Sequence, residues 1–324
     1  MHSFWHTLQK PLLVLAPMAD VTDPAYRKLI QETGAPDVFW TEFVSADGLY
    51  ATRERVEMLD EDNPLMRDLK YEKNEHPIVA QIFGGNPDTI RYAANLAREL
   101  GFDGVDINMG CPDKTIEKQG AGAGMMKHPE DAPAIIRAAQ ESGLPVSVKT
   151  RMGYNRDEMD TWLPILLKEN LSALTVHLRT RKEMSLVPAH WELASRVVEL
   201  RDTYAPETLV LGNGDVASKQ EALSKITETG LDGVMLGRAI FGNPWLFTDR
   251  DYKDVSPKER MTALMTLSEY FDELRPRKSF HIMKKHFKAF IKGWDGASPL
   301  RAKLMEANTH EELVIILTEA RGLV

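Results

Sequence analysis

The chain has 324 residues, of which 43% are hydrophobic and 27% are charged, and its net charge is −8. This composition is typical of a soluble globular protein, and no apolar run approaches the roughly 18 residues that a membrane span requires. The single cysteine, Cys111, excludes an internal disulfide and favours a reducing, cytoplasmic location.

Eight short β-rich runs recur through the first three quarters of the chain. They lie at 12–16, 38–43, 78–82, 104–108, 145–149, 173–177, 208–212 and 233–236. Most are continuously apolar, as expected for parallel strands buried on both faces. Helical patterns at 87–100, 130–142, 157–169 and 218–229 lie between them. This alternation predicts an α/β fold of the (β/α)8 TIM-barrel type, and a doubly wound sheet is the alternative.

The pattern changes after about residue 255, where the β-rich runs stop. The segments 261–276, 280–294 and 310–321 each have the composition and periodicity of a helix. We therefore predict two domains, a TIM barrel over residues 1–250 and a small C-terminal all-helical domain over residues 251–324.

Polar or glycine-containing segments follow nearly every predicted strand, where a barrel enzyme builds its active site. These residues are Pro17, Met18, Glu42, Gln81, Asn108, Cys111, Lys149, Arg151, His177, Arg179, Arg181, Asn213, Gly214, Asp215, Gly237 and Arg238. Glycines and Arg238 after the last two strands predict a phosphate site, which a short helix starting near Ala239 would complete. Lys149 can stabilise negative charge on a reduced flavin or an enolate, and an ion pair at the barrel mouth is the alternative. No HxH, HExxH or CxxC motif occurs, so we predict no metal site.

The segment 275–303 is strongly basic although the whole chain is acidic. It contains nine Lys or Arg residues and one Asp, a local balance of +8. Lys284, Lys288 and Lys292 are spaced four residues apart, so they would form one helical stripe next to Lys285. This stripe predicts contact with RNA phosphates, and a solvated surface helix is the alternative.

Seven segments, in order, resemble the signature blocks of the tRNA-dihydrouridine synthases. They are LAPMADVTDPAYR, VAQIFGGNP, DINMGCPDKTIEKQGAGAG, VKTRMGY, LTVHLRTR, LGNGDV and MLGRAIFGNPWLF, and the basic tail resembles that family's helical RNA-binding domain. The resemblance implies an FMN-dependent barrel that takes reducing equivalents from NADPH or NADH and reduces the C5–C6 bond of a uridine in tRNA. Hydride would pass from reduced FMN to C6, and Cys111 would give the proton to C5.

The resemblance also implies roles for individual residues. Asn108 and Arg151 would position flavin or uracil, and Arg179 and the lysines Lys284, Lys285, Lys288 and Lys292 would contact substrate or RNA. The residues expected to bind the flavin are Pro17, Met18, Ala19, Gln81, Asn108, Lys149, His177, Asn213, Gly214, Asp215, Gly237 and Arg238. A thiol suits the acid role because it is mostly protonated near neutral pH yet acidic enough to give up its proton.

Departures from the family pattern, of which Leu178 concerns the site, and three rival functions accompany this interpretation. Leu178 stands where the family usually has glycine, so a contact with flavin or substrate is expected to differ there. The rivals are an FMN-dependent dehydrogenase of free pyrimidines, a flavin- and folate-dependent RNA methyltransferase, and an RNA-binding protein without redox activity. A basic tail favours tRNA over a free pyrimidine, and a monomer without membrane or metal partners would leave most room for tRNA.

Overall fold

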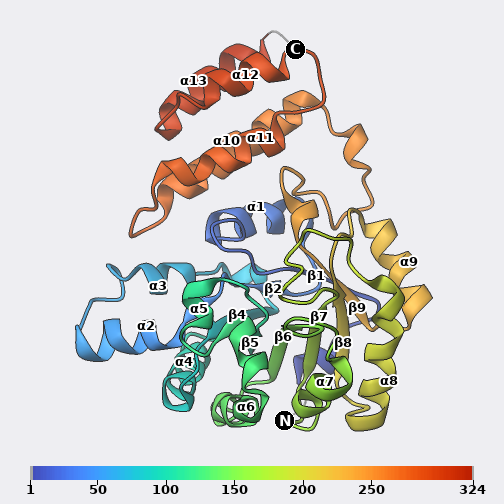
Figure 1. The fold of residues 1–324 in the computed structure, drawn as a ribbon. Coiled ribbons are helices and arrows are strands. Elements are labelled where there is room, and N and C mark those ends of the chain that lie inside the picture. The colour runs from blue at the N-terminus through green and yellow to red at the C-terminus, as the bar shows by residue number, and fades with distance from the viewer. Residues whose placement is uncertain (1–2, 323–324) are drawn as a thin grey trace.

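A computed structural model describes residues 3–322 of the chain. Its parallel strands form a barrel, and helices surround that barrel and cover one end of it (Figure 1). The strands are β1 (Leu12–Leu15), β2 (Phe39–Trp40), β3 (Val44–Ser45), β4 (Ile78–Phe83), β5 (Gly104–Met109), β6 (Val146–Arg151), β7 (Ala173–His177), β8 (Leu209–Asn213) and β9 (Gly233–Leu236).

The strand order β1-β9-β8-β7-β6-β5-β4-β2 returns to its starting point. A parallel bridge between Val14 and Val38 joins β1 to the segment before β2, so the sheet closes on itself. All eight predicted strands are present, and the barrel prediction is confirmed over the doubly wound alternative.

The second predicted strand, 38–43, is divided by a bulge. Trp40 pairs with Val79 and Val44 pairs with Ile82, so three residues of one strand face two residues of β4. Thr41 fills part of the gap, because its hydroxyl accepts the N–H of Gln81 at 3.0 Å. A bulge changes the direction in which side chains point, and this one includes the buried Glu42.

Helices that connect the strands form the outer layer (Figure 1). They are α1 (Pro24–Gly34), α2 (Ala46–Tyr50), α3 (Pro64–Asp68), α4 (Pro87–Glu99), α5 (Lys114–Glu117), α6 (Ala132–Gln140), α7 (Met159–Leu167), α8 (Ala194–Tyr204) and α9 (Lys219–Thr229). Prolines open several of them where the missing N–H costs nothing; in α4, for example, Asn86 caps the helix and Pro87 follows.

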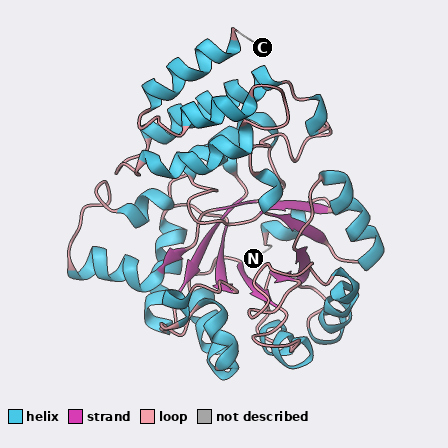
Figure 2. Ribbon diagram, turned by 45° about the horizontal axis from the view of Figure 1, so that its top comes forward, coloured by secondary structure: helices cyan, strands magenta, loops and turns pink. Residues whose placement is uncertain are grey.

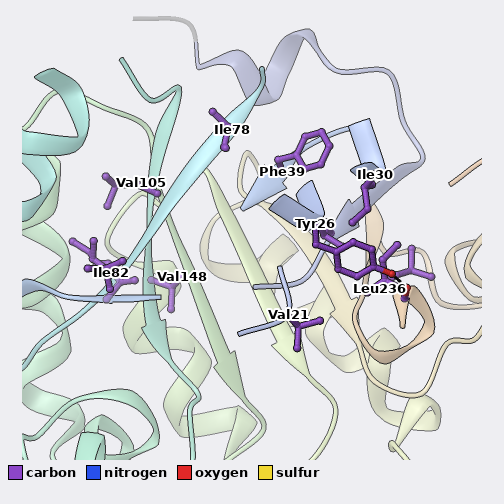
Figure 3. Close-up of a cluster of buried hydrophobic side chains, with 14 of the residues drawn as sticks. Val21, Tyr26, Ile30, Phe39, Ile78, Ile82, Val105, Val148 and Leu236 are labelled. Carbon is purple, nitrogen blue, oxygen red and sulfur yellow. Dashed lines mark hydrogen bonds between the residues drawn. The ribbon is translucent and has the colours of Figure 1, made fainter. Parts of the chain in front are cut away.

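Apolar side chains fill both the barrel and the space under its helices. Val105 and Val148 lie on neighbouring strands, while Tyr26 and Ile30 of α1 pack outside the sheet (Figure 3). A second cluster fills the opposite end of the barrel, where Trp5 is 1% exposed and its ring lies 5.7 Å from that of Trp40.

The C-terminal region consists of four helices stacked beyond α1 (Figures 1 and 2). They are α10 (Pro257–Glu273), α11 (Lys284–Phe290), α12 (Ala297–Leu304) and α13 (His310–Arg321). The single helix predicted over 280–294 is wrong: Phe280–Met283 form a 3-10 turn, α11 ends at Phe290, and α12 follows separately. Residues of α10 and α11 belong to the same buried cluster as the barrel helices, so the two regions pack together.

The domain boundary at residue 250 stays a prediction. No helix within residues 3–322 combines the length and the apolar character needed to cross a membrane.

Candidate functional site

A cavity of about 520 Å³ opens at the carboxyl ends of β1, β6, β7, β8 and β9. The parallel register explains its composition, because Arg151 pairs with His177 and His177 with Asn213 at the same level of the barrel. Its lining includes many of the residues predicted from the sequence: Pro17, Met18, Lys149, His177, Arg179, Asn213, Gly214, Asp215, Gly237 and Arg238. Strand topology therefore brings together residues that are 220 positions apart, as predicted.

Lys149 is the cation on the inner wall of this cavity. Its Nζ donates to Oδ1 of Asn213 at 3.3 Å, and Nδ2 of Asn213 donates to the carbonyl of Met235 at 2.7 Å. Burial, with the nearby charge of Arg151, lowers the pKa of Lys149 to about 8. A bound anion would raise the pKa of Lys149 and stabilise its charged form, so the site is suited to a ligand that carries or acquires negative charge.

His177 is held neutral beside Lys149. Burial lowers its pKa, and the surrounding cations Lys149, Arg151, Arg179 and Arg238 lower it further. Nη1 of Arg179 lies 3.0 Å from Nε2 of His177. A guanidinium only donates, so Nε2 accepts and the imidazole proton is on Nδ1.

The outer part of the cavity combines glycines with an ion pair. Asp215 pairs with both Arg179 and Arg238, and the hydrogen bond from Arg179 holds the pKa of Asp215 below its usual range. Gly214 has a φ of 133°, which favours glycine, and an added Cβ would lie 2.7 Å from Cβ of Ala189. The helix predicted from Ala239 is wrong, because Arg238–Ile240 form only one 3-10 turn. The predicted phosphate site therefore depends on the glycines and Arg238 rather than on a helix dipole.

Cys111 is positioned by a chain of side chains that begins in the barrel interior. Asp106, which is fully buried, accepts from Nε2 of Gln81 at 2.6 Å, and Oε1 of Gln81 accepts from Nδ2 of Asn108 at 3.0 Å. Oδ1 of Asn108 then accepts the backbone N–H groups of Gly110 and Cys111 at 3.1 and 2.9 Å. Gln81 and Asn108 lie outside the cavity lining. Through these hydrogen bonds they orient the loop that carries Cys111.

Cys111 lies outside the cavity lining, and it is partly buried against the cluster of Phe83, Ile116 and Ala121. Burial raises its pKa, so the thiol is protonated at neutral pH. Gly122 packs directly on this loop with a φ of 57°, and an added Cβ would lie 2.8 Å from the carbonyl oxygen of Cys111. The glycine-rich run after the cysteine therefore allows close backbone approach.

Two predicted substrate-binding arginines are anchored to backbone carbonyls. Arg151, 7% exposed, donates from Nε to Gly110 at 2.8 Å and from Nη1 to Thr180 and Met184 at 3.1 and 2.9 Å. Arg179, 2% exposed, donates from Nε to Val187 at 2.7 Å. These contacts show both side chains holding loops around the site.

The basic segment does not form the predicted single stripe. Lys284 and Lys288 lie on α11, but Lys292 lies beyond the end of that helix. Nζ of Lys284 donates to the carbonyl of Met305 at 2.8 Å, which ties α11 to the end of α12. Lys285 lies 3.9 Å from Asp20, whereas Lys288 and Lys292 are exposed.

Lys278, which also belongs to the basic segment, is buried at the contact between the helical region and the barrel. Its side chain is 4% exposed and its Nζ lies 2.8 Å from Glu42, 3.4 Å from Asp68, 3.6 Å from Asp20 and 4.0 Å from Asp23. Burial raises the pKa of Glu42 to about 7 against the opposing effect of Lys278. Lys278 therefore neutralises a buried acidic cluster and is not available to RNA.

Sequence reasoning missed three contributors to this end of the barrel, and two residues that it singled out lie outside the cavity lining. Ser185 lines the cavity from a long loop, Asp106 supports Gln81 from inside the barrel, and Lys278 docks the helical region; only Asp106, a carboxylate within an apolar strand, had a local signal. Ala19 is exposed and outside the cavity lining. Leu178, a departure from the family pattern, is fully buried in the core and also lies outside that lining.

Solved structures support the barrel fold. The chain is similar to morphinone reductase, with a TM-score of 0.50 and 11% identity over 72% of this chain and 84% of that chain. Histamine dehydrogenase from Rhizobium sp. 4-9 gives a TM-score of 0.51 at 12% identity, over 80% of this chain and 48% of that chain. At such identities the likeness concerns the fold alone.

Sequence relatives are far closer. The chain is 40% identical to "Probable tRNA-dihydrouridine synthase 2" of Bacillus subtilis (strain 168), over 98% of this chain and 96% of that protein. It is also 40% identical to a "Probable tRNA-dihydrouridine synthase" of Staphylococcus epidermidis, over 96% and 94% of the two chains. The family model for dihydrouridine synthase (Dus) matches residues 14–321. This chain therefore belongs to the dihydrouridine synthase family, whose members are oxidoreductases that reduce uridine.

Proposed function

We propose that this protein reduces a uridine of tRNA to 5,6-dihydrouridine, with FMN in the strand-end cavity, NADPH or NADH as reductant, and Cys111 as the proton donor. The observation that carries the proposal is the chain's single thiol, which is protonated, is held in place by Asn108 and lies within electrostatic range of Lys149 on the cavity wall, although Cys111 itself is outside the cavity lining. The protein is expected to act as a monomer in the cytoplasm, where tRNA is found.

The cavity fits a flavin mononucleotide in size and chemistry. Its volume of about 520 Å³ lies within the range of small-molecule sites. Ala16, Pro17 and Met18 offer an apolar wall for a ring system, and Gly237 lies beside this wall. Gly214 and Arg238 would hold the phosphate, since backbone N–H groups and a guanidinium both bind anions.

The lining residues suit the charge changes of the reaction. Reduced flavin bound in this cavity would supply the hydride that adds to C6 of uracil. Lys149 would stabilise negative charge at the cavity wall, and neutral His177 would offer Nδ1–H as a hydrogen-bond donor. Cys111 would release its proton to C5 of the base, a role that a largely protonated thiol near the cavity can fill.

The helical region supports a folded RNA substrate over a free pyrimidine. Lys288 and Lys292 are exposed on a region that packs above the barrel (Figure 1), although the chain as a whole has a net charge of −8. A free pyrimidine would have no contact with these lysines. Phosphate contacts of this kind supply much of the affinity for nucleic acid.

The test compares wild type with Cys111→Ala on tRNA that lacks dihydrouridine, in the presence of NADPH. Wild type is expected to form dihydrouridine, and the variant to lose at least about 100-fold in rate because it lacks the general acid, while it retains FMN. Cys111→Ser serves as the matched control for loop geometry. Equal rates for Cys111→Ala and wild type would assign the proton to another group. A yellow wild-type protein without tRNA activity would direct attention to free pyrimidines and to folate-dependent methylation.

A further inference from the structure

An exposed apolar loop borders the strand-end cavity. We define the rim loop as Met184, Ser185, Leu186, Val187 and Pro188, all of which are exposed, and Ser185 itself lines the cavity. Leu186 is 85% exposed, Met184 38% and Val187 36%. Only eight large hydrophobic side chains are exposed among residues 3–322, and three of them lie in this loop. A concentration of apolar surface at one site indicates a contact with a partner.

The rim loop is braced from below by two buried arginines. Arg151 donates to the carbonyl of Met184 at 2.9 Å, and Arg179 donates to the carbonyl of Val187 at 2.7 Å, one on each side of Leu186. Burying a guanidinium group is costly unless its hydrogen bonds are made. Two buried arginines that both bond to this loop therefore indicate that its backbone conformation is fixed. The fold fixes this loop in place while leaving its apolar side chains in solvent.

Hydrogen bonds of Glu183 and Leu186 fix the same turn. Oε2 of Glu183 accepts from the backbone N–H and the hydroxyl of Thr180 at 2.7 and 3.0 Å, and Oε1 lies 3.0 Å from Nε2 of His190. The N–H of Leu186 donates to the carbonyl of Glu183 at 2.9 Å. The loop is therefore closed by its own hydrogen bonds as well as by the arginines.

The same arginines connect the rim loop to the reacting groups. Arg151 also donates to the carbonyl of Gly110, the neighbour of Cys111, and Arg179 also contacts His177 at the cavity wall. Arg181, just before the loop, lies within 3.4 Å of the carbonyl of Pro112 on the other side of the cysteine. The rim loop is therefore connected through shared arginines to both the cysteine loop and the cavity wall.

Cations beside the loop favour a polyanionic partner. Nζ of Lys127 lies 4.6 Å from the ring centre of Tyr154, and the guanidinium of Arg181 lies 5.4 Å from it. The backbone N–H of Lys182, which is exposed, donates to the carbonyl of Tyr154 at 2.9 Å. Two carboxylates contact this group, since Glu117 pairs with Lys127 and Arg181 and Glu158 accepts the N–H of Tyr154 at 2.8 Å. An apolar tip beside cationic side chains, of which Lys182 is exposed, matches a base stack and its phosphates.

We propose that the rim loop contacts the substrate RNA beside the target uridine, and that Leu186 enters the base stack where that uridine has left it. This inference rests on the proposed function and adds a step to it. A base must leave its stack before its C5 and C6 can be reached, and apolar side chains in other nucleic-acid-binding proteins occupy gaps between bases in this way. Leu186 is a positioning residue, since it acts on the RNA and not on the reacting atoms.

The test uses Leu186→Ser, Leu186→Met and Leu59→Ser in the full-length holoenzyme. Leu59, 62% exposed, is the matched control because it lies between α2 and α3, outside the cavity lining. Dihydrouridine mapping with wild type first identifies the target uridine, and absence of any product would count against the proposed function itself. A tRNA with 2-aminopurine next to that uridine then reports unstacking by fluorescence, independently of turnover.

The expected result is a loss of about tenfold in kcat/KM for tRNA with Leu186→Ser, together with loss of the fluorescence rise. Leu186→Met should restore both, and Leu59→Ser should match wild type. The rate of NADPH oxidation without tRNA should be unchanged in every variant. Equal behaviour of Leu186→Ser and Leu59→Ser would overturn the proposal. A raised KM for NADPH would instead assign the loop to the coenzyme, and a changed oligomeric state in light scattering would assign it to a second copy.

Discussion

The strand ends of the barrel and the C-terminal helical region differ in how strongly the sequence determines where a charged residue lies. At the strand ends, Lys149 and His177 lie where their strands predict, because parallel register brings successive strand ends to one level. In the helical region, Lys278 is buried against four carboxylates, although its neighbours in sequence suggest an RNA-facing charge.

The difference follows from the range of the interactions involved. Strand topology is set by short segments whose burial patterns are visible locally. The partners of Lys278 are Asp20, Glu42 and Asp68, more than 200 residues earlier in the chain, and no helical periodicity encodes them. The same lysine connects the helical region to the β1–α1 loop, whose first residues, Pro17 and Met18, line the cavity.

Removing the charge of Lys278 should have the largest effect on stability. Lys278→Met leaves Glu42 and Asp23 buried without this cation, and loss of one partner of a buried pair costs about 4 kcal/mol in the free energy of unfolding. Without the cation the pKa of Glu42 would rise above about 7, so the folded variant binds more protons than the unfolded chain. Its stability should therefore fall as pH rises, with a larger deficit at pH 8 than at pH 6.

Urea unfolding of Lys278→Met at these two pH values measures both quantities. Lys253→Met is the matched control, since the Lys253 side chain is 90% exposed and its loss should change stability little. A deficit equal to that of Lys253→Met, or one that is larger at pH 6, would show that Lys278 does not neutralise the acidic cluster. The burial of Lys278 would then have no role in docking the helical region on the barrel.

Replacing Asp106 inside the barrel should have a smaller effect on stability, and it should stabilise the protein where Lys278→Met destabilises it. Burial raises the pKa of Asp106 to about 6 from 3.8, so the folded state holds a proton that the unfolded chain releases, and stability falls between about pH 4 and 6. Asp106→Asn keeps an oxygen for Gln81 and turns an amide toward the Ser147 hydroxyl, 2.6 Å from Asp106 in the wild type. A pKa raised by about two units corresponds to about 3 kcal/mol of destabilisation of the ionised Asp106, and the weaker hydrogen bonds of an amide offset part of it. We therefore expect Asp106→Asn to raise the free energy of unfolding by about 2 kcal/mol at pH 7.

Urea unfolding of wild type and Asp106→Asn at pH 5, 6 and 7 tests this prediction. The variant should lose the decline in stability that Asp106 causes over this interval, and Ser142→Ala, a buried hydroxyl away from the chain of Gln81 and Asn108, controls for a general loss of buried hydrogen bonds. A parallel decline in both proteins would show that Asp106 is ionised without penalty.

The sequence predicts the fold well where local pattern and topology agree. All eight strands lie within a residue or two of their predicted runs, except at 41–43, where the bulge depends on Thr41 bonding to Gln81 across the sheet. The helix predicted over 280–294 ends early, because apolar periodicity continues through Ile291 while the backbone turns at that residue, whose carbonyl accepts from Arg301 at 2.9 Å. That contact is invisible in the segment itself.

The candidate site shows the same division. Residues that end strands, such as Asn213 and Gly237, are brought together as predicted because position in a strand determines position in the barrel. The orientation of a side chain is less accessible to sequence reasoning. Arg151 and Arg179 end up donating to loop carbonyls, and Ser185 reaches the cavity from a connection whose path depends on those donations.

The smallest predicted effect concerns the lysines that the structure leaves exposed. Lys288→Glu with Lys292→Glu should weaken tRNA binding about tenfold at moderate salt, because both changes remove contacts with phosphates. Each lost contact should also reduce the dependence of affinity on salt concentration. Lys284→Glu should have its main effect on stability, because Lys284 is bonded to Met305 at 2.8 Å. Binding of unmodified tRNA at several salt concentrations, with retained flavin as the control for folding, separates the two. If Lys284→Glu reduced affinity and salt dependence as much as the double variant, the stripe predicted from sequence would describe the RNA-binding surface better than the folded arrangement does. The helical region would then follow local pattern as closely as the strand ends do.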